Sequence, residues 1–233
     1  MNEYIFTTDE DKNLIYTFAS NKLTSRHMKI ISLYKTLALH DYNKELNDLP
    51  DFLENLYLSS IFDQPVNNLP KTLKKLSIGD FINDRFNQSV NNLPVNLEIL
   101  QLGTKFNQSV DYLPNSLKIL ILGTEFNQPI NNLPNLLEEL TIGYKYNNCY
   151  FNHSVDNLPK SLKILLLNLD NKILINKLPY GLENLLLIGK IEMKCNYPPN
   201  IKKILFDRKN VKLYDEILME HSDKIITIQH QKD

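Results

Sequence analysis

Hydrophobic and polar positions recur along this chain with a period of about twenty residues, and one dipeptide marks the period. The dipeptide Leu-Pro occurs seven times, and Pro198-Pro199 continues the series after Tyr197, which stands in place of the leucine. Such a period is typical of solenoids, in which each repeat packs only against its neighbours. The seven pairs are Leu49-Pro50, Leu69-Pro70, Leu93-Pro94, Leu113-Pro114, Leu133-Pro134, Leu158-Pro159 and Leu178-Pro179.

Each unit also holds three apolar residues in the pattern L-x-x-L-x-L. This spacing predicts one short strand per unit, with side chains that point alternately into the core and outward. Stacked strands of this kind pair in parallel about 4.8 Å apart and bury a continuous column of leucines. The proline after each leucine favours an extended return segment, and a unit of this length leaves no room there for a full helix. The pattern is clearest at Leu97, Leu100 and Leu102, at Leu117, Leu120 and Leu122, and at Leu137, Leu140 and Ile142.

Three further kinds of residue complete the unit. Phe86, Phe106 and Phe126 occupy one position of the repeat and are predicted to fill the core. The asparagine after each phenylalanine is predicted to be buried and to form a hydrogen-bonded ladder from turn to turn. A glycine closes several strands, which predicts either a positive φ or a close approach of two backbones. These glycines are Gly79, Gly103, Gly123 and Gly143.

The L-x-x-L-x-L core resembles the leucine-rich-repeat family. The run F-N-Q-P-I-N-N-L-P, from Phe126 to Pro134, resembles its FNIP repeat subfamily, which occurs in slime moulds and in giant viruses that infect amoebae. The resemblance extends roughly from Ile31 to Asp207. It implies a protein-interaction scaffold and not an activity, and we expect no enzymatic activity and no cofactor.

The predicted fold is therefore a repeat solenoid, a leucine-rich-repeat-like right-handed coil with one parallel β-sheet. It has about nine repeats of ~20 residues, a mostly extended convex side and short helical caps. We expect an N-terminal helical cap at residues 1–30, FNIP or leucine-rich repeats at 31–207, and a C-terminal cap at 208–233.

Charge and composition exclude several kinds of partner. Lys and Arg total 26 and Asp and Glu total 27, and this balance argues against nucleic acid as a ligand. No stretch approaches eighteen apolar residues, and the first twenty residues lack an apolar run, so we expect neither a membrane span nor a signal peptide. The two cysteines, Cys149 and Cys195, favour a reducing compartment. The expected location is the cytoplasm, that of the host if the source is viral.

One column of the repeat alternates in charge without exception. Adjacent strands would place opposite charges about 5 Å apart, so a slip by one repeat would bring like charges together. We interpret this column as structural. Its members are Lys35, Glu54, Lys74, Glu98, Lys118, Glu138, Lys163, Glu183 and Lys202.

Two longer units place candidate contact residues on one edge of the solenoid. The insertions, at about 80–85 and 144–150, both fall between a strand and the next phenylalanine. Insertions in repeat proteins form loops that often lie on the binding face, although neutral drift of loop length explains them equally well. The aromatic and apolar residues that they offer a partner are Phe81, Ile82, Tyr144, Tyr146 and Tyr150.

The outward strand positions supply further candidates. In the C-terminal half these positions are apolar, and exposed apolar patches mark binding or self-association sites. We therefore expect Ile121, Leu166 and Leu186 to contact a protein partner or a second copy of the chain. The alternative is that a C-terminal cap folds over Leu186 and Leu205.

Caps are expected at both ends. Leu14, Ile15 and Phe18 lie at helical spacing, and Thr24 is placed to cap a second helix, while a hairpin through Tyr4–Phe18 is an alternative. At the C-terminus, residues 211–221 have the pattern of an amphipathic helix, and Ile225, Ile226 and Ile228 are expected to add a last strand.

Two hypotheses of function follow. The first is a non-enzymatic binding module that uses the exposed sheet face and the two insertions. The second is a substrate-recognition subunit of a cullin-type ubiquitin ligase, because Leu23 to Leu37 resembles the later part of an F-box. Its opening Leu-Pro is missing here, so this would be a degenerate F-box. The histidines form no recognisable arrangement with carboxylates, so no catalytic or metal site is expected.

Overall fold

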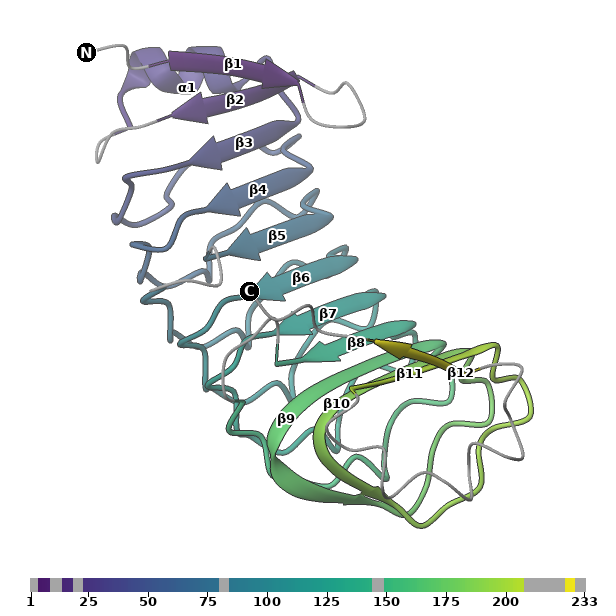
Figure 1. Ribbon diagram of the computed structural model, residues 1–233. Helices are drawn as coiled ribbons and strands as arrows, with labels where there is room; N and C mark the ends of the chain where they lie inside the picture. The colour runs from purple at the N-terminus through teal and green to yellow at the C-terminus, as the bar shows by residue number, and fades with distance from the viewer. Residues whose placement is uncertain are drawn as a thin grey trace.

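A computed structural model describes residues 4–8, 14–18, 23–79, 84–143, 149–207 and 225–228. These residues contain a single twelve-stranded sheet in which the spatial order of the strands is their order in the sequence (Figure 1). The first two strands pair antiparallel, and every other pair is parallel. The elements are β1 (Tyr4–Thr8), β2 (Leu14–Phe18), α1 (Ser25–Ile31), β3 (Thr36–Leu39), β4 (Asn55–Leu58), β5 (Lys75–Ile78), β6 (Ile99–Leu102), β7 (Ile119–Leu122), β8 (Glu139–Ile142), β9 (Ile164–Ile175), β10 (Asn184–Met193), β11 (Lys203–Asp207) and β12 (Ile225–Ile228).

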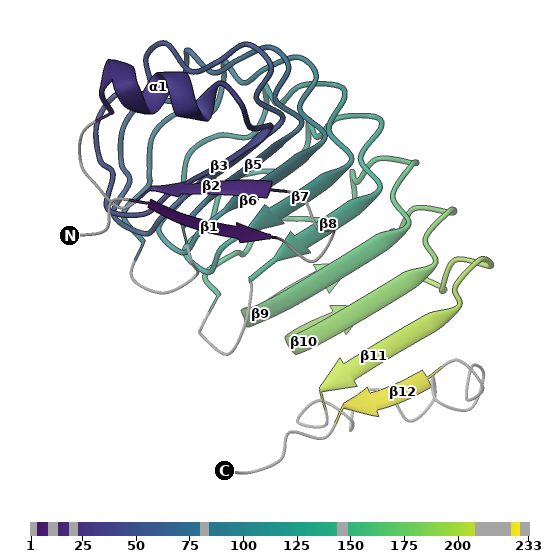
Figure 2. The ribbon, with the colours of Figure 1, turned by 90° about the horizontal axis from the view of Figure 1, so that it is seen from above.

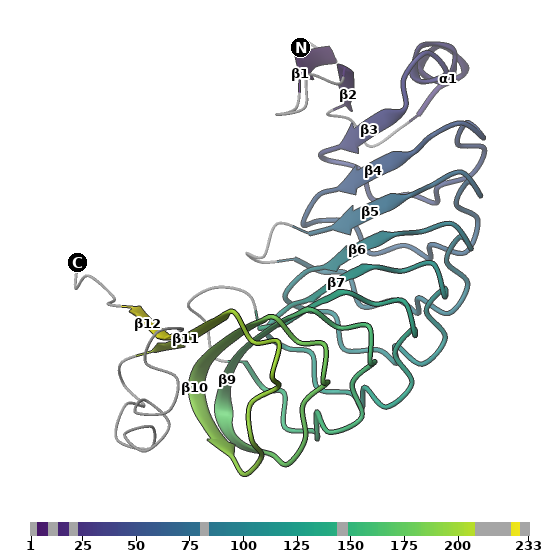
Figure 3. The ribbon, with the colours of Figure 1, turned by 90° about the vertical axis from the view of Figure 1, so that its right-hand side faces the viewer.

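The predicted parallel solenoid is confirmed. It has about eight turns of about twenty residues each, and it contains little helix. The chain is curved, and the strands lie along the inner side of the curve while the return segments lie along the outer side (Figures 2 and 3). We call the sheet surface on the inner side the concave face.

The repeated pattern explains the strands and the turns between them. Leu100, Leu120 and Leu140 stand opposite one another on β6, β7 and β8, and each is at most 1% exposed. In each Leu-Pro turn, the proline carbonyl accepts a hydrogen bond from the leucine N–H three residues later, as from Leu117 to Pro114 at 3.1 Å. Proline suits this position because only its carbonyl is needed there.

The predicted aromatic column also forms. The five phenylalanine rings stack in sequence, with neighbouring ring centroids 6.0–6.1 Å apart and each side chain almost fully buried. This spacing lies in the range in which aromatic pairs attract one another. The column consists of Phe62, Phe86, Phe106, Phe126 and Phe151.

The asparagine ladder is confirmed, but the expected burial of its members is wrong. The side-chain carbonyl of Asn107 accepts hydrogen bonds from the backbone N–H of Asn127, at 2.9 Å, and from the side chain of Gln128, at 3.1 Å. Asp63 occupies the same position and accepts the equivalent bonds from the next turn. Asn107 and Asn127 are half-buried and Asn87 is exposed, because the ladder runs along an edge of the solenoid and not through its core.

The strand-ending glycines divide into the two predicted kinds. Gly79 and Gly143, which precede the insertions, have φ values of +86° and +78°. Gly103 and Gly123 do not have a positive φ, and glycine is required there because a neighbouring group leaves no space for a Cβ atom. A Cβ atom on Gly123 would collide with the carbonyl of Gly103 in the preceding turn. A side chain is therefore excluded at both pairs of glycines, for different reasons.

The alternating charges form ion pairs. Glu54 pairs with Lys35 at 2.6 Å and with Lys74 at 3.0 Å, and these two ammonium groups hold the pKa of the Glu54 carboxyl below its ordinary value. The same contact joins Lys118 to Glu98, Lys163 to Glu138, and Lys202 to Glu183. Each pair is exposed to solvent and contributes little stability by itself, which fits a role in register.

The N-terminal segment corrects one expectation. Leu14, Ile15 and Phe18 lie in β2, which pairs antiparallel with β1, so the predicted first helix is wrong and the alternative hairpin is present. The second predicted helix is α1, and Thr24 caps it by accepting a hydrogen bond from the backbone of His27. Helical spacing gave the wrong prediction because this segment forms backbone hydrogen bonds with β3, a strand distant in sequence, and is therefore extended.

At the C-terminus the predicted last strand is confirmed as β12, which pairs with β11. The amphipathic helix predicted at 211–221 lies outside the described residues. Before this end, β9 and β10 are much longer than the other strands, because these units continue in extended conformation where earlier units have the Phe-Asn turn. Their pairing shifts register between Gly189 and Ile191.

Candidate protein-binding surface

Two columns of outward-pointing side chains make up the concave face. They alternate with the buried leucines along each strand, so the eight strands β4 to β11 each contribute two residues. All the side chains of these two columns are half-buried, except Ser77, which is buried, and Lys203, which is exposed. One column reads Tyr57, Ser77, Gln101, Ile121, Thr141, Leu166, Leu186 and Leu205, and the other reads Asn55, Lys75, Ile99, Ile119, Glu139, Ile164, Asn184 and Lys203.

The concave face is polar near β4 and β5, and from β6 onward most of its outward positions are apolar, although β8 presents only Glu139 and Thr141. At the polar end, the ammonium group of Lys75 lies 5.1 Å from the centre of the Tyr57 ring, a cation–π contact. Further along, neighbouring strands present branched aliphatic side chains that are partly open to solvent. We define this apolar concave patch as Ile99, Ile119, Ile121, Ile164, Leu166, Leu186 and Leu205.

The structure brings together three of the residues predicted to bind a partner. Ile121, Leu166 and Leu186 share one column, with Thr141 between the first two. Their role in binding remains a prediction. Leu186 is half-buried, and the cap proposed to cover it falls largely outside the described residues.

The edge insertions contribute less to the described surface. Tyr150 is 56% exposed, and its backbone N–H donates to the carbonyl of Thr124 at 2.9 Å, which places it beside the Phe-Asn turns. The remaining predicted residues, Phe81, Ile82, Tyr144 and Tyr146, lie outside the described residues.

One residue of the concave face was missed by the search for apolar and aromatic contacts. Glu139 lies on β8, and its register partners on the two flanking strands are Ile119 and Ile164. Between Lys75 and Lys203 it is the one charged residue of its column. The signal in the sequence is a single charged residue within an otherwise aliphatic stretch of this column.

A second group of exposed apolar side chains lies at the Leu-Pro turns, away from the concave face. Val95 and Tyr112 are each 70% exposed, and Leu136 is 58% exposed. These residues occupy different positions of the repeat and do not form a column. They are suitable controls for the concave face, because they are apolar and exposed but belong to another surface.

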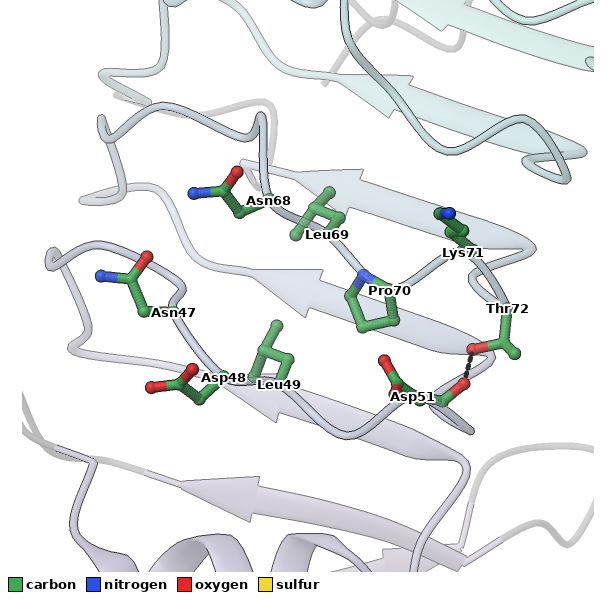
Figure 4. A pocket seen from close by; sticks show the side chains of 9 residues that line it. All are labelled: Asn47, Asp48, Leu49, Asp51, Asn68, Leu69, Pro70, Lys71 and Thr72. Carbon is green, nitrogen blue, oxygen red and sulfur yellow. Dashed lines mark hydrogen bonds between the residues drawn. The ribbon is translucent and has the colours of Figure 1, made fainter.

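A shallow hollow lies between the first two Leu-Pro turns and is lined by both of them (Figure 4). The hydroxyl of Thr72 donates to the backbone carbonyl of Leu53 at 2.9 Å and also to that of Asp51. Ser116 and Ser161 make the equivalent bond to the preceding repeat. Within the hollow, Thr72 therefore joins one turn to the preceding one, and we assign this contact a structural role.

Cys149, Cys195 and His153 have structural surroundings. Cys149 is 1% exposed, and burial raises the pKa of the Cys195 thiol. The ring of His153 packs edge-on against Phe151, and its Nε2 lies 3.1 Å from the backbone carbonyl oxygen of Asn127, so it contacts the preceding repeat beside the asparagine ladder. Within the described ranges, no group of three or more His, Cys, Asp or Glu side chains is placed to hold a metal ion.

Comparison with known proteins identifies the class of repeat. A family model described as FNIP Repeat matches residues 42–81 and 106–145. The chain therefore contains FNIP repeats, as the Phe-Asn and Leu-Pro positions indicated. Such leucine-rich-repeat solenoids are typical protein-binding scaffolds. A search of curated proteins finds no match to the chain.

Among solved structures, the chain is similar to CroV588, described as a novel circular LRR protein. The two are 26% identical with a TM-score of 0.45, and the similarity covers 93% of this chain and 43% of the other. The chain thus spans less than half the length of that protein. Separately, none of the helices in the described part of this chain has the length and apolar character needed to cross a membrane.

Proposed function

We propose that the chain is a non-enzymatic scaffold that binds a protein partner through its concave face. The observation that carries this proposal is the apolar concave patch, whose seven members lie on β6, β7, β9, β10 and β11. The patch consists of two apolar groups, on β6–β7 and on β9–β11, with the polar side chains of Glu139 and Thr141 on β8 between them. Partly exposed apolar groups of this kind favour association, because contact with a partner removes them from water. The edge residue Tyr150, which is exposed, is available to extend the contact.

The ubiquitin-ligase hypothesis has less support. Adaptor docking through an F-box requires helices, but β1 and β2, which precede the F-box-like segment, are strands, and α1 within it has only seven residues. Leu37, the last residue of the F-box-like segment, lies in β3 and is fully buried in the solenoid core. We therefore favour the binding module.

The test compares two Leu→Asp substitutions in the full chain. Leu166→Asp introduces a charge into the apolar concave patch, and Leu136→Asp introduces the same charge at an exposed Leu-Pro turn. Both chains are first shown to fold by circular dichroism and thermal unfolding. Proteins that the wild-type chain captures from the native cell are identified, and their affinities for the three purified chains are then measured.

We expect Leu166→Asp to weaken binding at least tenfold and Leu136→Asp to leave it unchanged. The opposite pattern, or equal affinity of all three chains, would overturn the proposal. Sedimentation of the chain alone shows whether it self-associates, and the same two substitutions then show whether the concave face forms that contact.

A further inference from the structure

The two halves of the apolar concave patch flank one carboxylate, that of Glu139, which shares β8 with Thr141. The side chain is half-buried, and the flanking strands place Ile119 and Ile164 directly opposite it on either side. Within the described parts of the chain, no Lys, Arg or His lies within ion-pair distance of this carboxylate. The preceding residue differs, because Glu138 pairs with Lys163 at 2.6 Å.

This arrangement makes the patch selective. A purely apolar partner that covered the patch would take the carboxylate out of water without compensation, which is unfavourable. A partner that brings a Lys or Arg side chain to the same point replaces the lost water with a charge-assisted hydrogen bond. Glu139 therefore excludes one kind of partner and admits another, and both effects contribute to specificity.

The spacing of the strands indicates the shape of the partner segment. Neighbouring strands are about 4.8 Å apart, so the columns offer a new side chain at that interval along the solenoid. One face of an α-helix repeats every three or four residues, a rise of about 4.5–6 Å, which matches this interval. Same-face residues of an extended strand lie about 6.6 Å apart and fall out of step after two or three contacts.

We propose that the apolar concave patch receives an amphipathic helix of a partner protein, and that one Lys or Arg within the apolar stripe of that helix pairs with Glu139. This inference rests on the proposed function and specifies the partner's chemistry. Lys75 and Lys203 lie three strands to either side of Glu139, about 14 Å away at strand spacing. The best-matched helix thus carries acidic residues about ten positions before and after its basic residue.

The experiment selects binders from a displayed library of helical peptides. The peptides have 26 residues, about 39 Å of helix. Leucines recur at three- and four-residue spacing, and the central stripe position and its flanks are randomised. Selection is run against the wild-type full chain, and clones that still bind the Leu166→Asp chain are removed, so that only ligands of the concave face remain. The same library is selected against the Glu139→Lys and Glu139→Gln chains after their thermal stability has been checked.

We expect Lys or Arg at the central position of wild-type binders, Asp or Glu at that position with Glu139→Lys, and no charge preference with Glu139→Gln. A Lys peptide and its Glu analogue should differ at least tenfold in affinity for the wild-type chain, and Glu139→Lys should reverse the order. Glu98→Gln is the matched control, because it removes a carboxylate that is already paired with Lys118. That chain should keep the wild-type preference.

Three outcomes would overturn the inference: binders without a central charge preference, no binders that depend on Leu166, or a concave face occupied by a second copy of the chain. The last is detected if Glu139→Lys converts a sedimenting dimer into a monomer. The proposed function fails separately, if native partners bind the Leu166→Asp chain normally. If native binding requires Leu166 while the library shows no basic residue, the proposed function stands and only this inference falls.

Discussion

Truncation of one ring in the aromatic column gives a strong test of the fold. Phe106 is fully buried, and its ring lies 6.1 Å from the rings of Phe86 and Phe126, with interplanar angles of 11° and 1°. Burial of such a side chain contributes about 1.5–3 kcal/mol, and each aromatic contact adds about 0.5–1.5 kcal/mol. Phe106→Ala should therefore lower the free energy of unfolding by about 3–5 kcal/mol, the range for buried phenylalanines.

Urea unfolding provides the measurement. The chain has twelve tyrosines and no tryptophan, so tyrosine fluorescence and far-ultraviolet circular dichroism are the two probes. Phe52→Ala serves as the control, because Phe52 is 43% exposed at a Leu-Pro turn, and it should cost about 1 kcal/mol or less. Phe106→Leu keeps most of the apolar volume but loses both ring contacts, and we expect about 1–2 kcal/mol.

Pairs of substitutions then test the column itself. Phe106→Leu and Phe126→Leu affect the same ring contact, so their effects on the free energy of unfolding should not add. Phe106→Leu and Phe62→Leu are separated by the Phe86 ring, and their effects should add within about 0.5 kcal/mol. The reasoning is refuted if Phe106→Ala costs less than about 1 kcal/mol, or no more than the Phe52 control.

Three further predictions concern the ladders and the glycines. Asn107→Ala removes the acceptor of two hydrogen bonds and should lower the free energy of unfolding in urea by about 1–3 kcal/mol. Asn107→Asp keeps that acceptor, as Asp63 does, and should lower it by less than about 1 kcal/mol. Equal losses for the two substitutions would contradict this prediction. The pKa of Glu54 is lowered in the folded state, so its stabilising contribution is complete above the unfolded pKa and disappears as the pH falls through the folded pKa. Glu54→Gln should therefore reduce the loss of unfolding free energy at acid pH. An unchanged dependence of that free energy on pH would refute the assignment. Gly189, at φ +100°, has no room for a Cβ atom beside the neighbouring strand, so Gly189→Ala should lower stability by more than about 1 kcal/mol in thermal unfolding. Gly181→Ala is the control, because a Cβ atom there meets only ordinary contacts, and it should change stability by about 0.5 kcal/mol or less.

The repeat made much of the molecule predictable from sequence. Each unit repeats the same local pattern, so an alignment of the units also aligns the leucine, phenylalanine and charged columns. The strand register reproduces those alignments, as Leu120 opposite Leu140 and the Lys118–Glu98 ion pair show. In a solenoid the main contacts join equivalent positions of neighbouring units, so one-dimensional periodicity carries three-dimensional information.

The candidate surface was predictable in part. The alignment identified Ile121, Leu166 and Leu186 as outward residues of one apolar column, because side chains alternate along a strand. It did not show that Glu139 is half-buried without an ion-pair partner among the described residues, since that depends on which cations approach from adjacent strands. Expected contact area also points to aromatic and aliphatic residues, and it does not identify a charged residue such as Glu139.

The sequence by itself determined the period, the strands, the core columns and the residues that face outward, because each depends on a pattern repeated within one unit and its neighbour. Only the tertiary structure decided that Leu14 and Ile15 join a strand and not a helix, since pairing with β3 outweighs their helical spacing. It also showed that the asparagine ladder lies at an edge, and that the sheet forms the inner side of a curve. These features depend on how whole segments pack in space, and no local pattern records them.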